Sequence, residues 1–120
     1  MEENTCVLIC VTVQKDCARL IRQGAAIAKE RGCRVQVLHV NARKGSQQTQ
    51  EEKGILNELF SLAHEADAEM NILYEENVAD AIARYAQECG ASTLILGPDR
   101  SGTSSRVRSL VPPEVEIINM

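Results

Sequence analysis

Two short segments of this 120-residue sequence are apolar or β-branched without a polar break, and they constrain the fold more than any other feature. One is Cys6–Val11, and the other is Thr93–Leu96, which stops at Gly97. An unbroken apolar run of this length is typical of a strand that is buried on both faces, and such strands occur inside parallel sheets. The sequence therefore predicts a parallel sheet in which these two segments are central strands.

A loop with two glycines follows the second run. After Gly97, four residues lead to Gly102, and Thr103, Ser104 and Ser105 then open a predicted short helix for which each of the three is a candidate cap. A strand, a glycine loop and a helix N-terminus in succession leave backbone N–H groups free to bind an anion. If the protein binds a phosphate, we expect the phosphate here.

The rest of the chain alternates between helical and strand patterns. Asp16 is a candidate cap for the first helix, which Gly32 ends, and Asn77 is a candidate cap for the third, which Gly90 ends. The polar segment Asn41–Glu52 is predicted to be a flexible loop. The predicted helices are 17–31, 54–66, 78–89 and 104–110, and the predicted strands are 6–11, 34–40, 69–74, 92–96 and 115–120.

Five strands alternating with four helices predict a single α/β domain over residues 1–120, in three layers around an open parallel sheet. The crossovers between parallel strands must be right-handed, and the two most apolar strands belong in the middle of the sheet. The strand order 3-2-1-4-5, a Rossmann-like arrangement, satisfies both conditions. Ligands of such sheets bind where the chain reverses direction, beyond the carboxyl ends of the strands. In this chain that place follows Val11 and Leu96.

Composition excludes several classes of partner. The net charge is −4 and the chain has one Phe, two Tyr and no Trp, so we expect no nucleic-acid partner. No apolar run approaches the roughly 20 residues of a membrane span. The cysteines number five, an odd count, and have apolar neighbours, so we expect reduced thiols and a cytoplasmic location. Cys6 and Cys10 would share one face of a strand and fill the core.

Catalytic and phospho-acceptor interpretations fail on the residues. A phospho-receiver domain needs acidic residues after its first and third strands, where this chain has Thr12 and Tyr74. His39 lies within a predicted strand and His64 on a helix, neither with a carboxylate or cysteine at a telling spacing, so we interpret His39 as structural and His64 as solvated. Asp99 is interpreted as a turn residue. The sequence therefore predicts no enzyme.

The order and spacing of several segments resemble the universal stress protein family, with adenine nucleotide alpha hydrolase-like architecture. The similarity runs nearly end to end, and it is close to the version found in bacterial potassium-sensor histidine kinases. The segments that carry it are Val7–Thr12, Ala25–Gly32, Val37–Val40, Asn77–Ile82 and Ser92–Gly97. The resemblance implies the 3-2-1-4-5 sheet, a dimer and, in one branch of the family, ATP binding.

The resemblance also implies which residues would contact a nucleotide. Thr12 stands where the ATP-binding branch has an aspartate, Val40 would supply a backbone contact to adenine, and Gly97 matches the first glycine of the G-x2-G-x9-G-[ST] loop. Keeping the length of that loop puts Arg100 and residues 110–111 at its remaining positions.

Shortening the loop instead matches Gly102 and Thr103 to its end and keeps Ser104–Leu110 as a helix, which we prefer. A smaller anion site then remains at the amides of Gly102, Thr103 and Ser104, with Arg100 or Arg106 within reach.

Two functions follow as hypotheses. The first is a non-catalytic regulatory or stress-response domain that binds ATP weakly or not at all and acts through an unknown protein partner. The alternative is a sensor module for an adenine nucleotide such as ATP, AMP or a cyclic dinucleotide, and an adenine nucleotide is the cofactor that this alternative implies. We expect a homodimer, because Val115–Met120 would be an exposed edge strand with Glu116 as its only charge.

Overall fold

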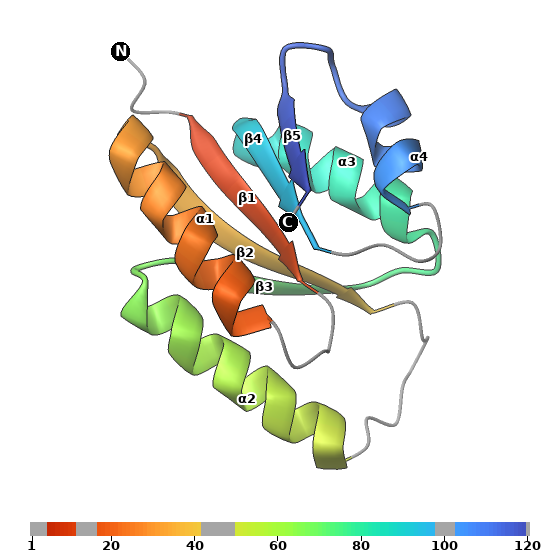
Figure 1. The fold of residues 1–120 in the computed structure, drawn as a ribbon. Coiled ribbons are helices and arrows are strands. Elements are labelled where there is room, and N and C mark those ends of the chain that lie inside the picture. Colours follow the sequence, from red (N-terminus) through yellow and green to blue (C-terminus); the bar gives the residue numbers. More distant parts are fainter. Residues whose placement is uncertain (1–4, 12–16, 42–49, 98–102, 120) are drawn as a thin grey trace.

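The computed structural model describes residues 5–11, 17–41, 50–97 and 103–119, and it shows alternating strands and helices (Figure 1). The elements are β1 (Cys6–Val11), α1 (Cys17–Arg31), β2 (Arg34–Asn41), α2 (Gln50–Glu65), β3 (Glu69–Tyr74), α3 (Val78–Cys89), β4 (Ala91–Leu96), α4 (Thr103–Leu110) and β5 (Glu116–Asn119). The predicted α/β class and the number and order of the elements are confirmed.

The five strands form one parallel sheet in the order β3-β2-β1-β4-β5. β1 lies in the centre because its residues are apolar on both faces, and Val7, Leu8 and Ile9 are fully buried. On one side Val11 pairs with His39 of β2, and on the other Cys10 pairs with Leu96 of β4. The predicted sheet order and the central positions of the two apolar runs are therefore confirmed.

Two hydrophobic cores lie on opposite faces of the sheet. α1 and α2 cover one face, where Leu20, Ile21 and Leu59 pack on Ile9 and Val37. α3 and α4 cover the other face, as Figure 1 shows. The second core contains Leu8, Leu38, Ala79, Ile82, Ala86, Ala91, Leu94 and Val107. The molecule therefore has the three predicted layers, and the chain changes face between β1, which leads to α1, and β4, which leads to α4.

α1 approaches the sheet closely because the residue that faces it at position 24 is glycine. A Cβ atom on Gly24 would lie 2.5 Å from Ile9 Cδ1 and 3.0 Å from Ile95 Cδ1. Both isoleucines are fully buried, so neither has free space into which to move. The contact fixes α1 across β1 and β4, the two strands whose carboxyl ends define the predicted site.

The helix ends follow the predicted glycine signals, but one predicted cap is wrong. Gly32 and Gly90 adopt left-handed conformations with φ of 68° and 69°, which glycine reaches without the steric penalty of a Cβ atom. Asn77 occupies the N-cap position of α3, yet its side chain makes no capping hydrogen bond. Its backbone carbonyl accepts the first hydrogen bond of the helix, from the N–H of Ala81 at 3.0 Å, and its φ of −92° and ψ of 86° lie outside the usual cap geometry.

The predicted Asn41–Glu52 loop is too long at both ends. β2 extends to Asn41, which pairs with Tyr74, and α2 begins at Gln50 rather than at Gly54. The four residues 50–53 are Gln, Glu, Glu and Lys, which are polar but have high helix propensity. Polarity was therefore the wrong criterion for placing the start of α2.

The last two elements also differ slightly from prediction. α4 already includes Thr103, Ser104 and Ser105, so none of these three residues precedes the helix as a cap would. β5 begins at Glu116 because the N–H of Val115 donates to the Pro112 carbonyl at 3.0 Å and closes a turn before the strand. Met120 lies outside the described residues.

Candidate functional site

The predicted ligand position is the edge of the sheet where β1 and β4 end. These two strands are parallel neighbours, and the helices that follow them lie on opposite faces of the sheet. Parallel strands whose connections leave in opposite directions create a crevice at their carboxyl ends. The observed topology therefore gives this chain the switch point at which a ligand of an open α/β sheet would bind.

Part of the predicted site lies in the described residues and part does not. Thr12, Arg100 and Gly102 are outside them, as is Asp99. Thr103 and Ser104 form the first turn of α4, which begins after residues 98–102. The structure therefore brings the start of α4 and the end of β4 to one edge of the sheet.

Gly97 lies directly after β4 and is half-buried. A Cβ atom on this residue would lie 3.3 Å from Cδ2 of Leu20, a buried side chain of α1. A larger residue would therefore push against α1 or into the crevice. Glycine keeps the backbone at the end of β4 accessible from the crevice, as close approach to a ligand requires.

Val40 lies near the end of β2, at the same edge of the sheet. Its neighbour His39 pairs with Val11, so Val40 is one position beyond the last paired residue of β1. Its side chain is half-buried and packs against the core on the α3 and α4 face. The side chain thus belongs to the packing, and the backbone is the part of Val40 that the resemblance assigns to a nucleotide.

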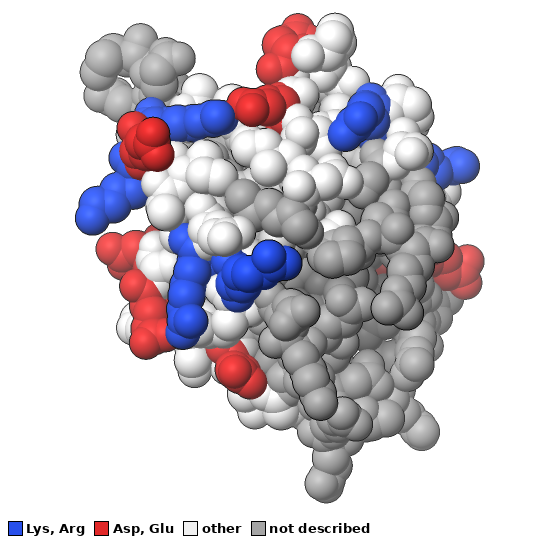
Figure 2. Space-filling model, in the orientation of Figure 1, with Lys and Arg blue, Asp and Glu red and all other residues white. Residues whose placement is uncertain are grey.

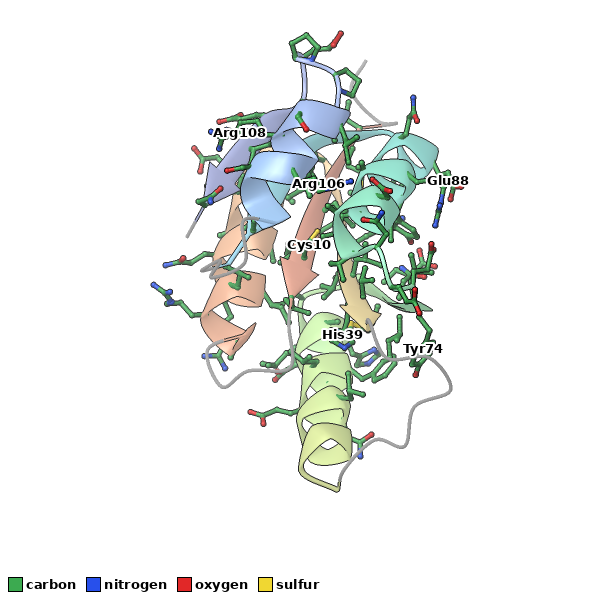
Figure 3. The ribbon with its side chains drawn as sticks, turned by 90° about the vertical axis from the view of Figure 1, so that its right-hand side faces the viewer. Cys10, His39, Tyr74, Glu88, Arg106 and Arg108 are labelled. Atoms are coloured by element: carbon green, nitrogen blue, oxygen red, sulfur yellow. The ribbon has the colours of Figure 1, made fainter. Side chains whose placement is uncertain are left out.

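His39 is a structural residue at this edge, as predicted. Its side chain is only 4% exposed, and Nδ1 lies 3.1 Å from the carbonyl oxygen of Val11. A carbonyl can only accept, so Nδ1 is the donor in this hydrogen bond. Among the described residues Nε2 has no hydrogen-bond partner. The bond ties the end of β2 to the end of β1, and Figure 3 shows His39 beside Tyr74 there.

The basic residues of α4 are exposed. Arg106 lies in the middle of the helix and Arg108 in its last turn, so Arg106 is the nearer of the two to the helix start (Figure 3). On the face shown in Figure 2, the described Lys and Arg side chains are interspersed with Asp and Glu rather than gathered into one basic patch. Among the described residues of α4, Arg106 and Arg108 are therefore the basic side chains that could act at this edge.

A different hollow lies at the opposite edge of the sheet. It is a groove of about 730 Å³ between the C-terminal ends of α1 and α2, bordered by Ala25, Lys29, Gln36 and Asp67. No sequence motif marks this groove, because the residues that line it are ordinary helix-end residues. The groove does not include the crevice after β1 and β4.

The described residues contain neither a helix suited to cross a membrane nor a cluster suited to bind a metal ion. No helix in this part of the chain is both long and apolar enough to cross a membrane. Within the same residues, no group of three or more His, Cys, Asp and Glu side chains is arranged to hold a metal ion.

The fold and the switch-point crevice define an open α/β domain of the nucleotide-binding type of architecture. Residues 4–110 match the model of the universal stress protein family, and the chain belongs to that family. Among curated proteins, it is 28% identical over 99 residues to the sensor protein KdpD of Clostridium acetobutylicum. That match covers 82% of this chain but only 11% of the KdpD protein.

Solved structures of the family share the fold. A universal stress protein from Archaeoglobus fulgidus has a TM-score of 0.74 at 21% identity, with 96% of this chain and 92% of that chain covered. Its complex with dAMP gives a TM-score of 0.74 at 23% identity and covers 96% of each chain. A universal stress protein in complex with cAMP has a TM-score of 0.71 at 16% identity, with 97% of this chain and 95% of that chain covered. At these identities the likeness establishes the fold.

Proposed function

We propose that this single domain of residues 1–120 is a regulatory, non-catalytic universal stress protein domain that binds ATP weakly or not at all. The observation that carries the proposal is the position of α4. Its start at Thr103 leaves residues 98–102 as the whole connection from Gly97. Four residues between Gly97 and Gly102 cannot surround a triphosphate as the longer loop of the ATP-binding branch does.

The residues that would hold ATP are also incomplete. Thr12 stands where that branch has an aspartate, so the carboxylate of that position is absent from this chain. The remaining anion donors are the amides at the start of α4, with Arg100 or Arg106 within reach. A helix N-terminus contributes about 0.3–1 kcal/mol to anion binding, and a charge-assisted hydrogen bond contributes about 1.5–3 kcal/mol. Such a set is suited to one phosphate rather than three.

The second candidate function is a sensor for an adenine nucleotide with a single phosphate. It is favoured by the complexes of two structural relatives with dAMP and with cAMP. Gly97 keeps the end of β4 open, and the half-buried Val40 leaves its backbone at the same edge of the sheet. A monophosphate needs fewer loop amides than a triphosphate, so the short loop is compatible with such a ligand.

Chromatography of the extract released by heating the purified protein separates the two candidates. If the protein is a regulatory domain without a ligand, we expect an extract free of nucleotide and a melting temperature that AMP, cAMP and ATP leave unchanged. The sensor predicts AMP or cAMP in the extract, or a melting shift that the substitution Gly97→Val abolishes. The control is Gly54→Ala, which alters an exposed helix position where an added Cβ atom meets nothing within 4 Å. Release of phosphate from ATP would contradict the non-catalytic part of the proposal.

The same proposal includes a homodimer that forms through β5. β5 pairs with β4 on one side and is an edge of the sheet, with Ile117 and Ile118 half-buried. An edge strand with few charges tends to pair with another strand. Sedimentation of a monomer at micromolar concentration would contradict this part.

We also propose a cytoplasmic location, an unknown protein partner and no nucleic-acid partner. Free thiols at Cys6, Cys10, Cys33 and Cys89 support the location.

A further inference from the structure

A cluster of thiols surrounds one arginine at the amino-terminal edge of the sheet, opposite the crevice. Cys6 is the first residue of β1, and its strand neighbours are Arg34 on β2 and Ala91 on β4. Cys89 is the last residue of α3, two positions before Ala91, and Cys33 directly precedes Arg34. Three distant parts of the sequence thus bring their cysteines to one place.

Cys6 and Cys89 are neighbours, because α3 ends at Cys89, two residues before Ala91, and Ala91 pairs with Cys6. Each sulfur atom also lies near a backbone carbonyl: Cys6 Sγ is 3.6 Å from the Val7 oxygen, and Cys89 Sγ is 3.7 Å from the Ala86 oxygen. Cys6 is fully buried, whereas Cys89 is half-exposed. The two thiols therefore differ in access: a solvent-borne reagent meets Cys89 first, and Cys6 lies directly behind it.

The surroundings also give the two thiols opposite acidities. The interaction with the neighbouring Cys6 thiol lowers the pKa of Cys89, and the positive charge of Arg34 lowers it further. The Arg34 guanidinium is close, because its Nη2 donates to the Cys89 carbonyl at 3.3 Å. The interaction with Cys89 and burial both raise the pKa of Cys6. A half-exposed thiol with a lowered pKa beside a buried thiol with a raised pKa is the arrangement of a reactive and a resolving cysteine.

We propose that Cys89 and Cys6 form an oxidant-responsive pair that a hydroperoxide converts into a disulfide. In the first step the Cys89 thiolate attacks one peroxide oxygen and the O–O bond breaks. The remaining alkoxide or hydroxide takes a proton and leaves as an alcohol or water. Cys89 becomes a sulfenic acid, so its sulfur is oxidised by two electrons and the peroxide is reduced by two.

In the second step Cys6 resolves the sulfenic acid. Its thiol loses the proton, and its sulfur attacks the sulfur of Cys89. The S–O bond breaks, and the departing hydroxide takes the proton to leave as water. The products are one disulfide, one water and one alcohol or second water, and a cellular thiol reverses the change by exchange. The disulfide joins the end of α3 to the start of β1.

The other described cysteines are less suited to either role. Cys33 packs against the core on the α1 and α2 face of the sheet, whereas Cys89 packs against the core on the α3 and α4 face. The Cys33 sulfur lies 3.1 Å from the hydroxyl oxygen of Thr5. Cys10 lies on the same face of β1 as Cys6 and packs against the second core, beneath the face that carries α3 and α4 (Figure 3). Burial raises the pKa of the Cys10 thiol to about 12, which suppresses its thiolate. Cys33 and Cys10 thus provide matched controls.

The test is peptide mapping of the full chain after treatment with hydrogen peroxide under non-reducing conditions. The expected result is a linked pair of peptides that contain Cys6 and Cys89, with the loss of two hydrogen atoms from the intact mass and reversal by dithiothreitol. The substitution Cys89→Ser abolishes the link, Cys33→Ser preserves it, and Cys6→Ala leaves a sulfenic acid on Cys89 that dimedone traps.

Three results would overturn the proposal. They are the absence of a Cys6–Cys89 link in the peroxide-treated wild-type chain, a predominant link to another cysteine or to a second copy, and loss of the link in Cys33→Ser. The wild-type map decides the question by itself, so the proposal remains testable even if the buried substitution Cys6→Ala prevents folding.

Discussion

The packing of α1 on the sheet predicts that one substitution, glycine to alanine, has opposite effects at two helical positions. At Gly24 an added Cβ atom would lie 2.5 Å from Ile9 Cδ1 and 2.6 Å from Ile9 Cγ1. At Gly54, in α2, an added Cβ atom has nothing within 4 Å. Gly24→Ala should therefore destabilise the protein, and Gly54→Ala should stabilise it.

The magnitudes follow from two terms. In either helix, alanine gains about 0.8–1 kcal/mol over glycine from helix propensity. At Gly24 this gain is opposed by overpacking against two fully buried isoleucines, which costs about 1–3 kcal/mol. Since the propensity term is common to both variants, the difference between them isolates the overpacking cost. For a chain of 120 residues, 1 kcal/mol corresponds to about 4 °C in melting temperature, so the variants should differ by about 4–12 °C.

Urea and thermal unfolding followed by circular dichroism measure both variants against the wild type. A second comparison tests the named contact, because Ile9→Ala removes Cγ1 and Cδ1. Gly24→Ala should cost less in an Ile9→Ala background than alone, giving a positive coupling in a double-mutant cycle. Equal stabilisation by the two glycine substitutions, or strictly additive effects in the cycle, would refute the close packing of α1.

Three further effects are expected. The Cys6–Cys89 disulfide closes a long loop, so oxidation should raise the free energy of unfolding by up to about 4–5 kcal/mol, and a chemical denaturation midpoint that does not rise would contradict the proposed link. Tyr85→Phe removes the 2.7 Å hydrogen bond to the buried Gln36 and should cost about 1–3 kcal/mol. Burial raises the pKa of Tyr85 from 10.0 to about 12, so the wild-type stability present below pH 10 should decline as the pH rises from 10 through 12, and the Phe variant should lack that part of the decline. Gly90→Ala forces a side chain into the left-handed region at φ 69° and should cost about 1–2 kcal/mol in the same unfolding assay, whereas an unchanged midpoint would argue against this helix end.

The fold could be predicted from the sequence because its signals are local and agree with one another. The apolar run at Cys6–Val11 specified both a strand and its central position, since a strand covered on both faces has no polar side. Gly32 and Gly90 marked helix ends because only a left-handed residue reverses the chain there at low cost. The start of α2 was missed, because polar residues with high helix propensity resemble a loop when only hydrophobic spacing is considered.

The candidate site was less predictable than the fold. Its position at the switch point follows from the strand order, which could be predicted from the sequence. The contribution of Leu20 to the wall at Gly97 depends on how α1 lies across the sheet, which no local pattern specifies. The proximity of Cys6 and Cys89 is of the same kind, because it joins residues far apart in sequence that no motif links. The binding roles of all the candidate residues remain predictions: Thr12, Val40, Gly97, Arg100, Gly102, Thr103 and Ser104.

Isothermal titration calorimetry with ATP, AMP and cAMP tests the central claim most directly. The helix start together with one charge-assisted hydrogen bond from an arginine would contribute about 2–4 kcal/mol, which corresponds to a dissociation constant of about 1 mM or weaker. The proposed function therefore predicts no ATP binding tighter than this range, with AMP or cAMP binding at least as well as ATP. A micromolar dissociation constant for ATP, with weaker binding of the monophosphates, would contradict the claim that the phosphate loop of this domain is too short to hold a triphosphate.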